Sequence, residues 1–245
     1  MRLAFASYLD AIAEEADRLD SLLAADLDRA ANLDKKVPAC PNWTARELLG
    51  HVAATLEFWA EHVAAGDPEE MTETVEECDP EAVAANADRL VAELRTAGPE
   101  APCWNWSGEE LTTAWVARQL AIETAVHRVD GEQSQGRPLP VELELAIDGI
   151  EQRIAVHLAS DLGEGSSASL GGTVCLICED APAAFVVEVE RGRLRWRHGR
   201  GPADVVLVGA ASELFLYTWN RLPPEALKRT GDLSVAEAWR KLPST

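Results

Sequence analysis

Apolar residues recur at three- and four-residue intervals through much of the first half of the chain, which is the spacing of a buried helical stripe. The first such stretch contains Tyr8, Ile12, Leu19 and Leu22. A second begins at Thr44, because Thr44 and Glu47 have the spacing of a helix capping box. Two more are expected over residues 81–97 and 113–129. Four amphipathic helices of this length predict a helical bundle around one core.

The second half of the chain mixes two periodicities. Residues 143–158 continue the helical spacing, and helical patterns return at residues 212–219 and 234–242. Between them lie short β-branched runs with alternating character, at residues 173–177, 185–189, 194–197 and 205–208. This order predicts a smaller α+β domain in which helices cover a mainly antiparallel sheet. The fold class is therefore α+β, with the helical bundle first.

The two halves are separated by a polar segment rich in glycine and proline, residues 131–140. Neither a helical nor a strand pattern is expected to cross such a segment. We therefore expect a helical-bundle domain over residues 1–138 and an α+β domain over residues 139–245.

Charge narrows the classes of partner. The 245 residues include 42 Asp and Glu against 22 Lys and Arg, a formal charge of −20, and most of the excess acid lies in the first half. Such a charge repels phosphate backbones and anionic lipids, so we expect no nucleic-acid partner and no membrane partner. A small molecule is the expected partner, and the expected assembly is a monomer or homodimer.

The expected compartment is the cytoplasm. No apolar run approaches the ~20 residues that cross a bilayer, and the first residues reach Asp10 too soon for a secretory signal. The five cysteines form no framework of short repeated spacings, which disfavours a disulfide-stabilised secreted fold. Cys175 and Cys178 have redox-motif spacing, but on a strand they point to opposite faces.

Candidate chemistry centres on the few histidines. On the fourth predicted helix, Glu123 and His127 are four residues apart and share a face, so both side chains can reach one metal ion. His51 lies beside the apolar stripe of the second helix. Polar groups in an apolar stripe need a partner, and a divalent ion bound by these three side chains would supply one. His62 and His157 fall at peripheral positions and are expected on the surface.

Two imidazoles and one carboxylate are a ligand set typical of catalytic zinc, in which a fourth position stays open. Asp130, one turn beyond His127, would then hold a ligand histidine in its metal-binding tautomer. Spacing alone leaves another interpretation open. The histidines would be satisfied core residues, and a helix salt bridge to Arg118 or Arg128 would account for the polar face.

The sequence also resembles the mycothiol-dependent maleylpyruvate isomerase family over nearly its whole length. In the first half the resemblance is carried by Pro41-Asn42-Trp43-Thr44, by Leu48-Leu49-Gly50-His51, by Trp115 and Arg118, and by the run 123–130, Glu-Thr-Ala-Val-His-Arg-Val-Asp. In the second half it is carried by Gly171-Gly172-Thr173-Val174, by residues 210–221, and by Gly231-Asp232-Leu233. The resemblance implies a DinB-like metal-binding bundle followed by a sterol-carrier-like domain.

The resemblance further implies that His51, Glu123 and His127 hold zinc, and that the open position takes the sulfur of mycothiol. Metal coordination deprotonates a thiol, and reversible addition of the thiolate to an electron-poor double bond permits cis–trans isomerisation. Arg221 matches an arginine that would bind a substrate carboxylate at a pocket between the domains. Ile122 departs from relatives that carry histidine there, which bears on the pocket rather than on the ligands.

Three other functions stay open at this point. A mycothiol S-transferase acting on electrophiles would use the same metal-bound thiolate, but the sulfur would remain in the product. A non-catalytic protein would keep the metal for structure or bind a small molecule through its second domain. Metal-activated hydrolysis ranks lower, because no second carboxylate is clearly placed as a base.

Overall fold

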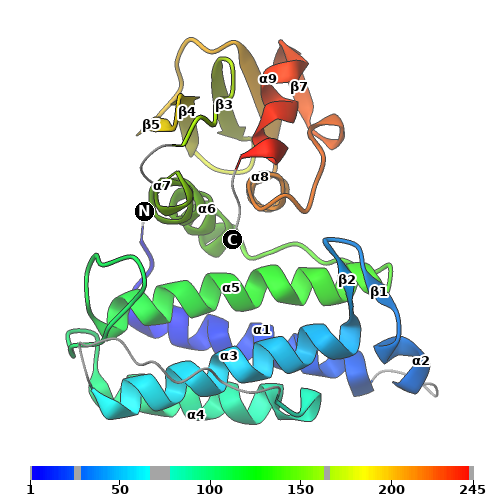
Figure 1. Cartoon of the computed structure of the whole chain (residues 1–245), viewed down its shortest axis with the longest axis vertical. Coiled ribbons are helices and arrows are strands. Elements are labelled where there is room, and N and C mark those ends of the chain that lie inside the picture. The colour runs from blue at the N-terminus through cyan, green and yellow to red at the C-terminus, as the bar shows by residue number, and fades with distance from the viewer. Residues whose placement is uncertain (1, 25–28, 67–77, 163–165, 243–245) are drawn as a thin grey trace. The chain divides into compact units, whose positions relative to one another are not determined.

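The computed structural model describes residues 2–24, 29–66, 78–162 and 166–242. Within them the chain divides into two compact units, residues 2–139 and residues 140–242. The first is helical and the second combines helices with a sheet (Figure 1). This confirms the predicted α+β fold class. No helix in the described ranges combines the length and the apolar character needed to span a membrane.

Four long helices lie side by side in the first unit and make most of its contacts (Figure 1). They are α1 (Phe5–Ala24), α3 (Ala45–Ala65), α4 (Val83–Ala97) and α5 (Thr113–Ser134). The predicted stripe of α1 is buried, since Tyr8, Ile12 and Leu19 are at most 4% exposed. Shorter elements complete the unit: α2 (Arg29–Leu33), the strands β1 (Lys36–Val37) and β2 (Cys40–Thr44), and a 3-10 turn at Pro80–Ala82.

Helix α3 begins as its sequence predicts. The Glu47 amide donates to the Thr44 hydroxyl, and the Thr44 amide donates to the Glu47 carboxylate at 2.7 Å. This reciprocal capping satisfies amide groups that a helix start leaves without intrahelical partners. The cap fixes where α3 begins, and therefore the height at which His51 lies in the bundle.

The sequence predicts no helix across residues 131–140. This is wrong for the first four of them, because α5 continues from Gly131 to Ser134. The reason is packing. A Cβ atom at Gly131 would lie 2.7 Å from Cδ1 of Leu19, so glycine lets α5 and α1 approach closely. The burial gained along α1 outweighs the modest helix propensity lost at one glycine.

A buried ionic cluster ties α5 to α1. Arg128 is fully buried; its Nε donates to Glu15 and its Nη1 donates to Glu132, each at 2.6 Å. The same Nη1 donates to the Leu139 carbonyl at 2.7 Å, and the Leu139 amide donates to Glu132. We call Glu15, Arg128, Glu132 and Leu139 the Arg128 cluster. Its two carboxylates share one guanidinium, a cation that the protein itself supplies.

The second unit is built on a five-stranded sheet of order β5-β4-β3-β6-β7. Its strands are β3 (Thr173–Cys178), β4 (Ala184–Glu190), β5 (Arg193–His198), β6 (Val205–Gly209) and β7 (Lys228–Gly231). All neighbours pair antiparallel except β3 and β6, which are parallel. The helices are α6 (Leu143–Gln152), a π-helical turn (Arg153–Leu158), α7 (Ala159–Asp161), α8 (Ala211–Thr218) and α9 (Leu233–Ala238), with 3-10 turns at Pro224–Ala226 and Trp239–Lys241.

Two of the expected histidine positions are wrong. His62 is fully buried, where its ring stacks on Phe58 and meets Trp104 edge to face. His157 is 8% exposed and packs edge to face on Trp219. Both imidazoles pack against aromatic side chains. The polar residues that flank each histidine in the sequence do not indicate these tertiary contacts. Cys175 and Cys178 are separate free thiols in β3, as expected for strand positions on opposite faces.

Candidate metal centre

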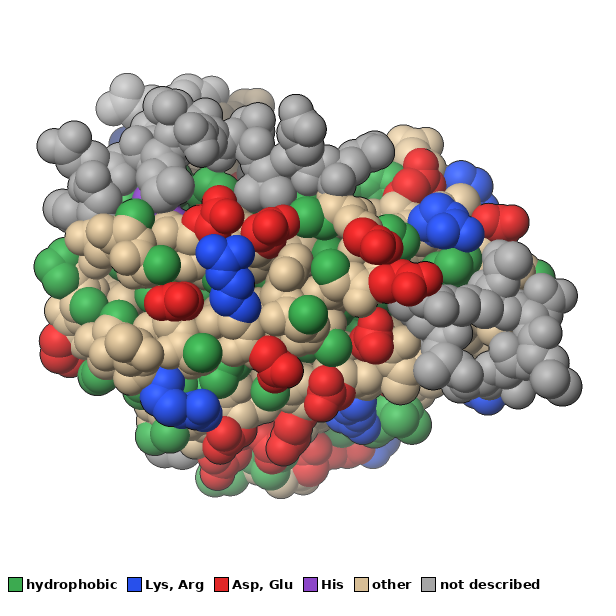
Figure 2. All heavy atoms as spheres, turned by 90° about the horizontal axis from the view of Figure 1, so that it is seen from below, with side chains coloured by type: hydrophobic (Ala, Val, Ile, Leu, Met, Phe, Trp, Pro, Cys, Tyr) green, Lys and Arg blue, Asp and Glu red, His purple; other side chains and the backbone are tan. Residues whose placement is uncertain are grey.

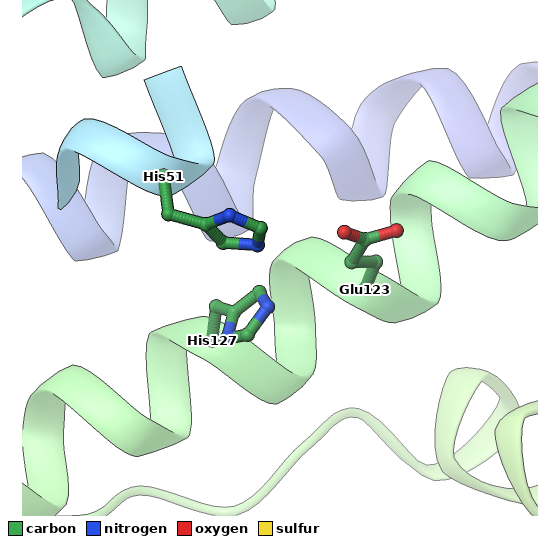
Figure 3. Close-up of side chains that lie close together, drawn as sticks. All are labelled: His51, Glu123 and His127. Atoms are coloured by element: carbon green, nitrogen blue, oxygen red, sulfur yellow. The ribbon is translucent and has the colours of Figure 1, made fainter. Parts of the chain in front are cut away.

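Helices α3 and α5 bring His51, Glu123 and His127 together in the bundle. Each side chain offers one ligand atom, and these three atoms lie within 4.8 Å of one another. Figure 3 shows His51 extending from α3 toward the pair on α5. The imidazole rings of His51 and His127 are 5.1 Å apart and nearly perpendicular. Three donor groups that face one another across two helices could hold one metal ion.

The ring of His127 is held from its far side. Its Nδ1 lies 3.1 Å from Oδ2 of Asp130, one turn farther along α5. Asp130 is fully buried, whereas the His127 side chain is 12% exposed. A buried carboxylate acceptor places the imidazole proton on Nδ1 and leaves the Nε2 lone pair for an ion. The structure therefore brings Asp130 to the position that the sequence predicts for it.

His51 is held in a state that suits a ligand. Burial lowers the pKa of His51, the nearby His127 lowers it further, and the carboxylate of Glu123 opposes these two effects. The neutral imidazole is the form that binds metals. The indole of Trp43, on β2, packs on the same ring with 4.9 Å between ring centroids. Trp43 belongs to the motif that carries the family resemblance, and its contact with His51 joins β2 to the site.

Glu123 has a partner that sequence reasoning missed. Nε2 of Gln119 donates to Oε2 of Glu123 at 3.1 Å. Gln119 precedes Glu123 by four residues, as Glu123 precedes His127. The same helical spacing that linked Glu123 to His127 was therefore available to identify Gln119.

The surroundings of the three donors are mainly apolar. A narrow hollow beside Glu123 and His127 is lined by Val52, Thr55, Leu56, Leu120 and Thr124. Apolar walls limit the access of water and strengthen electrostatic interactions with a bound ion. The donor set and its environment together fit a divalent cation such as zinc.

The charge of the exterior agrees with a cation as the bound species. Figure 2 shows a face on which Asp and Glu side chains outnumber Lys and Arg side chains, in keeping with the formal charge of −20. The resulting potential attracts divalent cations and repels anions at long range. An anionic substrate would therefore need a local cationic group to bind.

Arg221 is the side chain predicted for that task. It follows α8 in the second unit, and its Nη1 donates to the Trp219 carbonyl at 2.8 Å. The intervening Asn220 has a positive φ of 63°, which marks a sharp left-handed turn at this point. This turn fixes the local direction of the Arg221 backbone. Its role toward a substrate stays a prediction.

Comparison with known families covers both units. Residues 12–131 match the model of the mycothiol maleylpyruvate isomerase N-terminal domain. Residues 144–238 match the model of the C-terminal domain of the same enzyme family, abbreviated MDMPI. The chain belongs to the mycothiol-dependent maleylpyruvate isomerase family. Both halves of the resemblance seen in the sequence are thereby confirmed.

Solved structures of this family share the fold. The chain resembles a crystal structure of the mycothiol-dependent maleylpyruvate isomerase with a TM-score of 0.63 and 14% identity. It resembles a histidine-to-alanine mutant of that enzyme with a TM-score of 0.64, also at 14% identity. In each case the match covers 93% of both chains. No curated protein matches the sequence.

Proposed function

We propose that the protein is a metal-dependent enzyme that uses mycothiol to isomerise a cis double bond, as in maleylpyruvate, by reversible thiol addition. The observation that carries this proposal is the convergence of His51, Glu123 and His127, with donor atoms within 4.8 Å, in a chain of this family. These three side chains would hold the ion, and we propose that the ion is zinc. Zinc so held lowers the pKa of a thiol and makes it nucleophilic at neutral pH.

The residues of the chain divide the remaining work. Asp130 accepts from Nδ1 of His127 and orients its ring. His51, Glu123 and His127 would supply three ligands to the ion, and a zinc held by three protein ligands would keep a position for the cofactor sulfur. Arg221 is proposed to bind a substrate carboxylate through paired hydrogen bonds, which would offset the negative field of the protein.

An S-transferase would use the same donor set, and the two reactions differ in whether sulfur leaves. The test is product analysis with the full chain, purified without chelators, in the presence of mycothiol. Maleylpyruvate and a panel of electrophiles serve as substrates, and bound metal is measured in parallel. We expect about one zinc per chain and conversion of maleylpyruvate to its trans isomer. A thioether product would instead support the transferase.

The control is His127→Ala, which removes one donor and is expected to lose both metal and turnover. A wild-type chain that binds zinc yet converts neither class of substrate would support the non-catalytic alternative and overturn the enzyme proposal. Arg221→Lys is expected to raise KM for a dicarboxylate by about tenfold while leaving the zinc content unchanged, because a lysine cannot form the paired hydrogen bonds. An unchanged KM would remove Arg221 from the site.

A further inference from the structure

We infer, on the basis of the metal-dependent function proposed above, that Gln119 is a positioning residue that makes Glu123 a one-oxygen ligand. The number of positions that the carboxylate would occupy around the ion decides whether one remains for a thiol.

The geometry of α5 supports it. Gln119 lies one turn before Glu123, and its Nε2 donates to Oε2 of that carboxylate at 3.1 Å. Gln119 is only 4% exposed, so water competes little for its hydrogen bond to Glu123. The amide is neutral and donates without adding a charge to the site, whereas lysine or arginine here would compete with the metal for the carboxylate.

A carboxylate can bind a metal through one oxygen or through both. In Figure 3 one oxygen of Glu123 lies on the side of the two imidazoles, and the other lies on the side away from them. The hydrogen bond from Gln119 draws on one lone pair of Oε2 and fixes the plane of the carboxylate, which favours binding of an ion through the other oxygen. Glu123 then contributes one bond, His51 and His127 contribute two, and a fourth position stays available.

The test compares metal binding by the full chain, freed of metal with a chelator, in four forms. Gln119→Met removes the donor and keeps an unbranched side chain of similar length. Gln119→Asn retains the amide N–H donor on a side chain one methylene shorter and serves as the conservative variant. Gln135→Met is the matched control, because Nε2 of Gln135 also donates hydrogen bonds, to the Asn32 carbonyl and the Ser134 hydroxyl. Thermal unfolding of each metal-free form reports whether it folds.

Two readouts follow the ion itself. Competition with a chromogenic chelator gives the affinity for Zn²⁺, and the visible absorption of the Co²⁺ form reports coordination number, since four-coordinate Co²⁺ absorbs more strongly than higher-coordinate Co²⁺. We expect Gln119→Met to lower the affinity for Zn²⁺ by about tenfold to a hundredfold and to weaken the Co²⁺ absorption. Gln119→Asn should recover part of both, and Gln135→Met should match the wild type.

Wild-type affinity and spectrum in Gln119→Met would overturn the inference and leave the proposed function intact. An equal loss in Gln135→Met would also overturn it, because the effect would then reflect general loosening of the bundle. If Gln119→Met does not fold, Gln119→Leu gives the same comparison. Failure of the wild-type chain to bind either ion would remove the proposed metal itself, and the inference with it.

Discussion

Helix α5 carries two sets of polar side chains that are spaced alike but composed differently. In the Arg128 cluster, Arg128 and Glu132 are four residues apart, and Glu15 completes the set from α1. In the candidate metal centre, Glu123 and His127 are also four residues apart, and His51 completes the set from α3. The first set contains its own cation. The second is made of three electron-pair donors.

The two polar sets on α5 differ in how their charges are compensated. A buried charge is tolerated when the protein supplies the opposite charge and the remaining hydrogen bonds. Donor groups that face one another at short range are tolerated when a cation from outside compensates them. We therefore expect substitutions in the Arg128 cluster to affect folding and substitutions in the metal centre to affect binding.

The largest effect is expected from Arg128→Met. It removes the buried guanidinium that donates to both Glu15 and Glu132, which should lower the free energy of unfolding by about 3–5 kcal/mol. Urea denaturation measures this value. The control is Arg18→Ala, because Arg18 lies 3.7 Å from the same Glu15 but is 44% exposed. A surface pair of that kind contributes about 0–1 kcal/mol. Equal losses in the two variants would contradict the assignment.

The next effect is expected from Glu123→Gln, which removes the charge of one donor and keeps an oxygen that can accept from Gln119. Affinity for Zn²⁺ should fall by more than about a hundredfold, beyond what residues that only support a ligand contribute. The metal-free protein should keep its unfolding free energy to within about 0.5 kcal/mol. Zinc titration and urea denaturation check the two parts. A large loss of metal-free stability would assign Glu123 to the scaffold instead.

A smaller effect is expected from Asp130→Asn. The variant keeps the size and an acceptor oxygen but loses the charge that holds the proton on Nδ1 of His127. Affinity for Zn²⁺ should fall by about tenfold. Zinc competition measures it, with Asp180→Asn in the second unit as a control for a changed net charge. Indistinguishable affinities for the two variants would show that Asp130 does not support the ligand.

The smallest effect concerns pH. Burial lowers the pKa of His51 in the folded protein, so the unfolded chain takes up a proton at a higher pH than the folded one. Below about 6.5, the ordinary histidine pKa, the unfolded state binds more protons, and the stability of the metal-free protein should decline as the pH falls. His51→Gln should flatten this slope, whereas His198→Gln, at an exposed side chain, should not. Identical slopes in the two variants would refute the linkage.

The elements predicted best are those whose signal is local. The capping box at Thr44 fixes the start of α3 from two residues, and the alternating runs locate β3 to β6 to within one or two residues. Strand β7 was missed because Lys228–Gly231 contains no apolar residue and all four positions are exposed at the sheet edge. Its pairing with β6 is made by backbone hydrogen bonds, which leave no hydrophobic pattern.

The candidate site divides in the same way. Helical spacing placed Glu123, His127 and Asp130 on one face, and the structure brings them together with His51. Their action on an ion and that of Arg221 on a substrate stay predictions. The burial of His62 and the contact of Trp43 with His51 were not foreseen, because each depends on a neighbour from elsewhere in the fold. Spacing along one helix says nothing about what lies opposite.

The hydrogen bonds between the Arg128 cluster and the Leu139 backbone limit where the chain can be truncated. Both backbone groups of Leu139 are bound, its carbonyl by Arg128 and its amide by Glu132. A fragment designed to isolate the helices would therefore have to retain Leu139. A fragment that ends a few residues earlier would lose two hydrogen bonds to the buried Arg128–Glu132 pair. The free energy of unfolding of the truncated helices would fall accordingly.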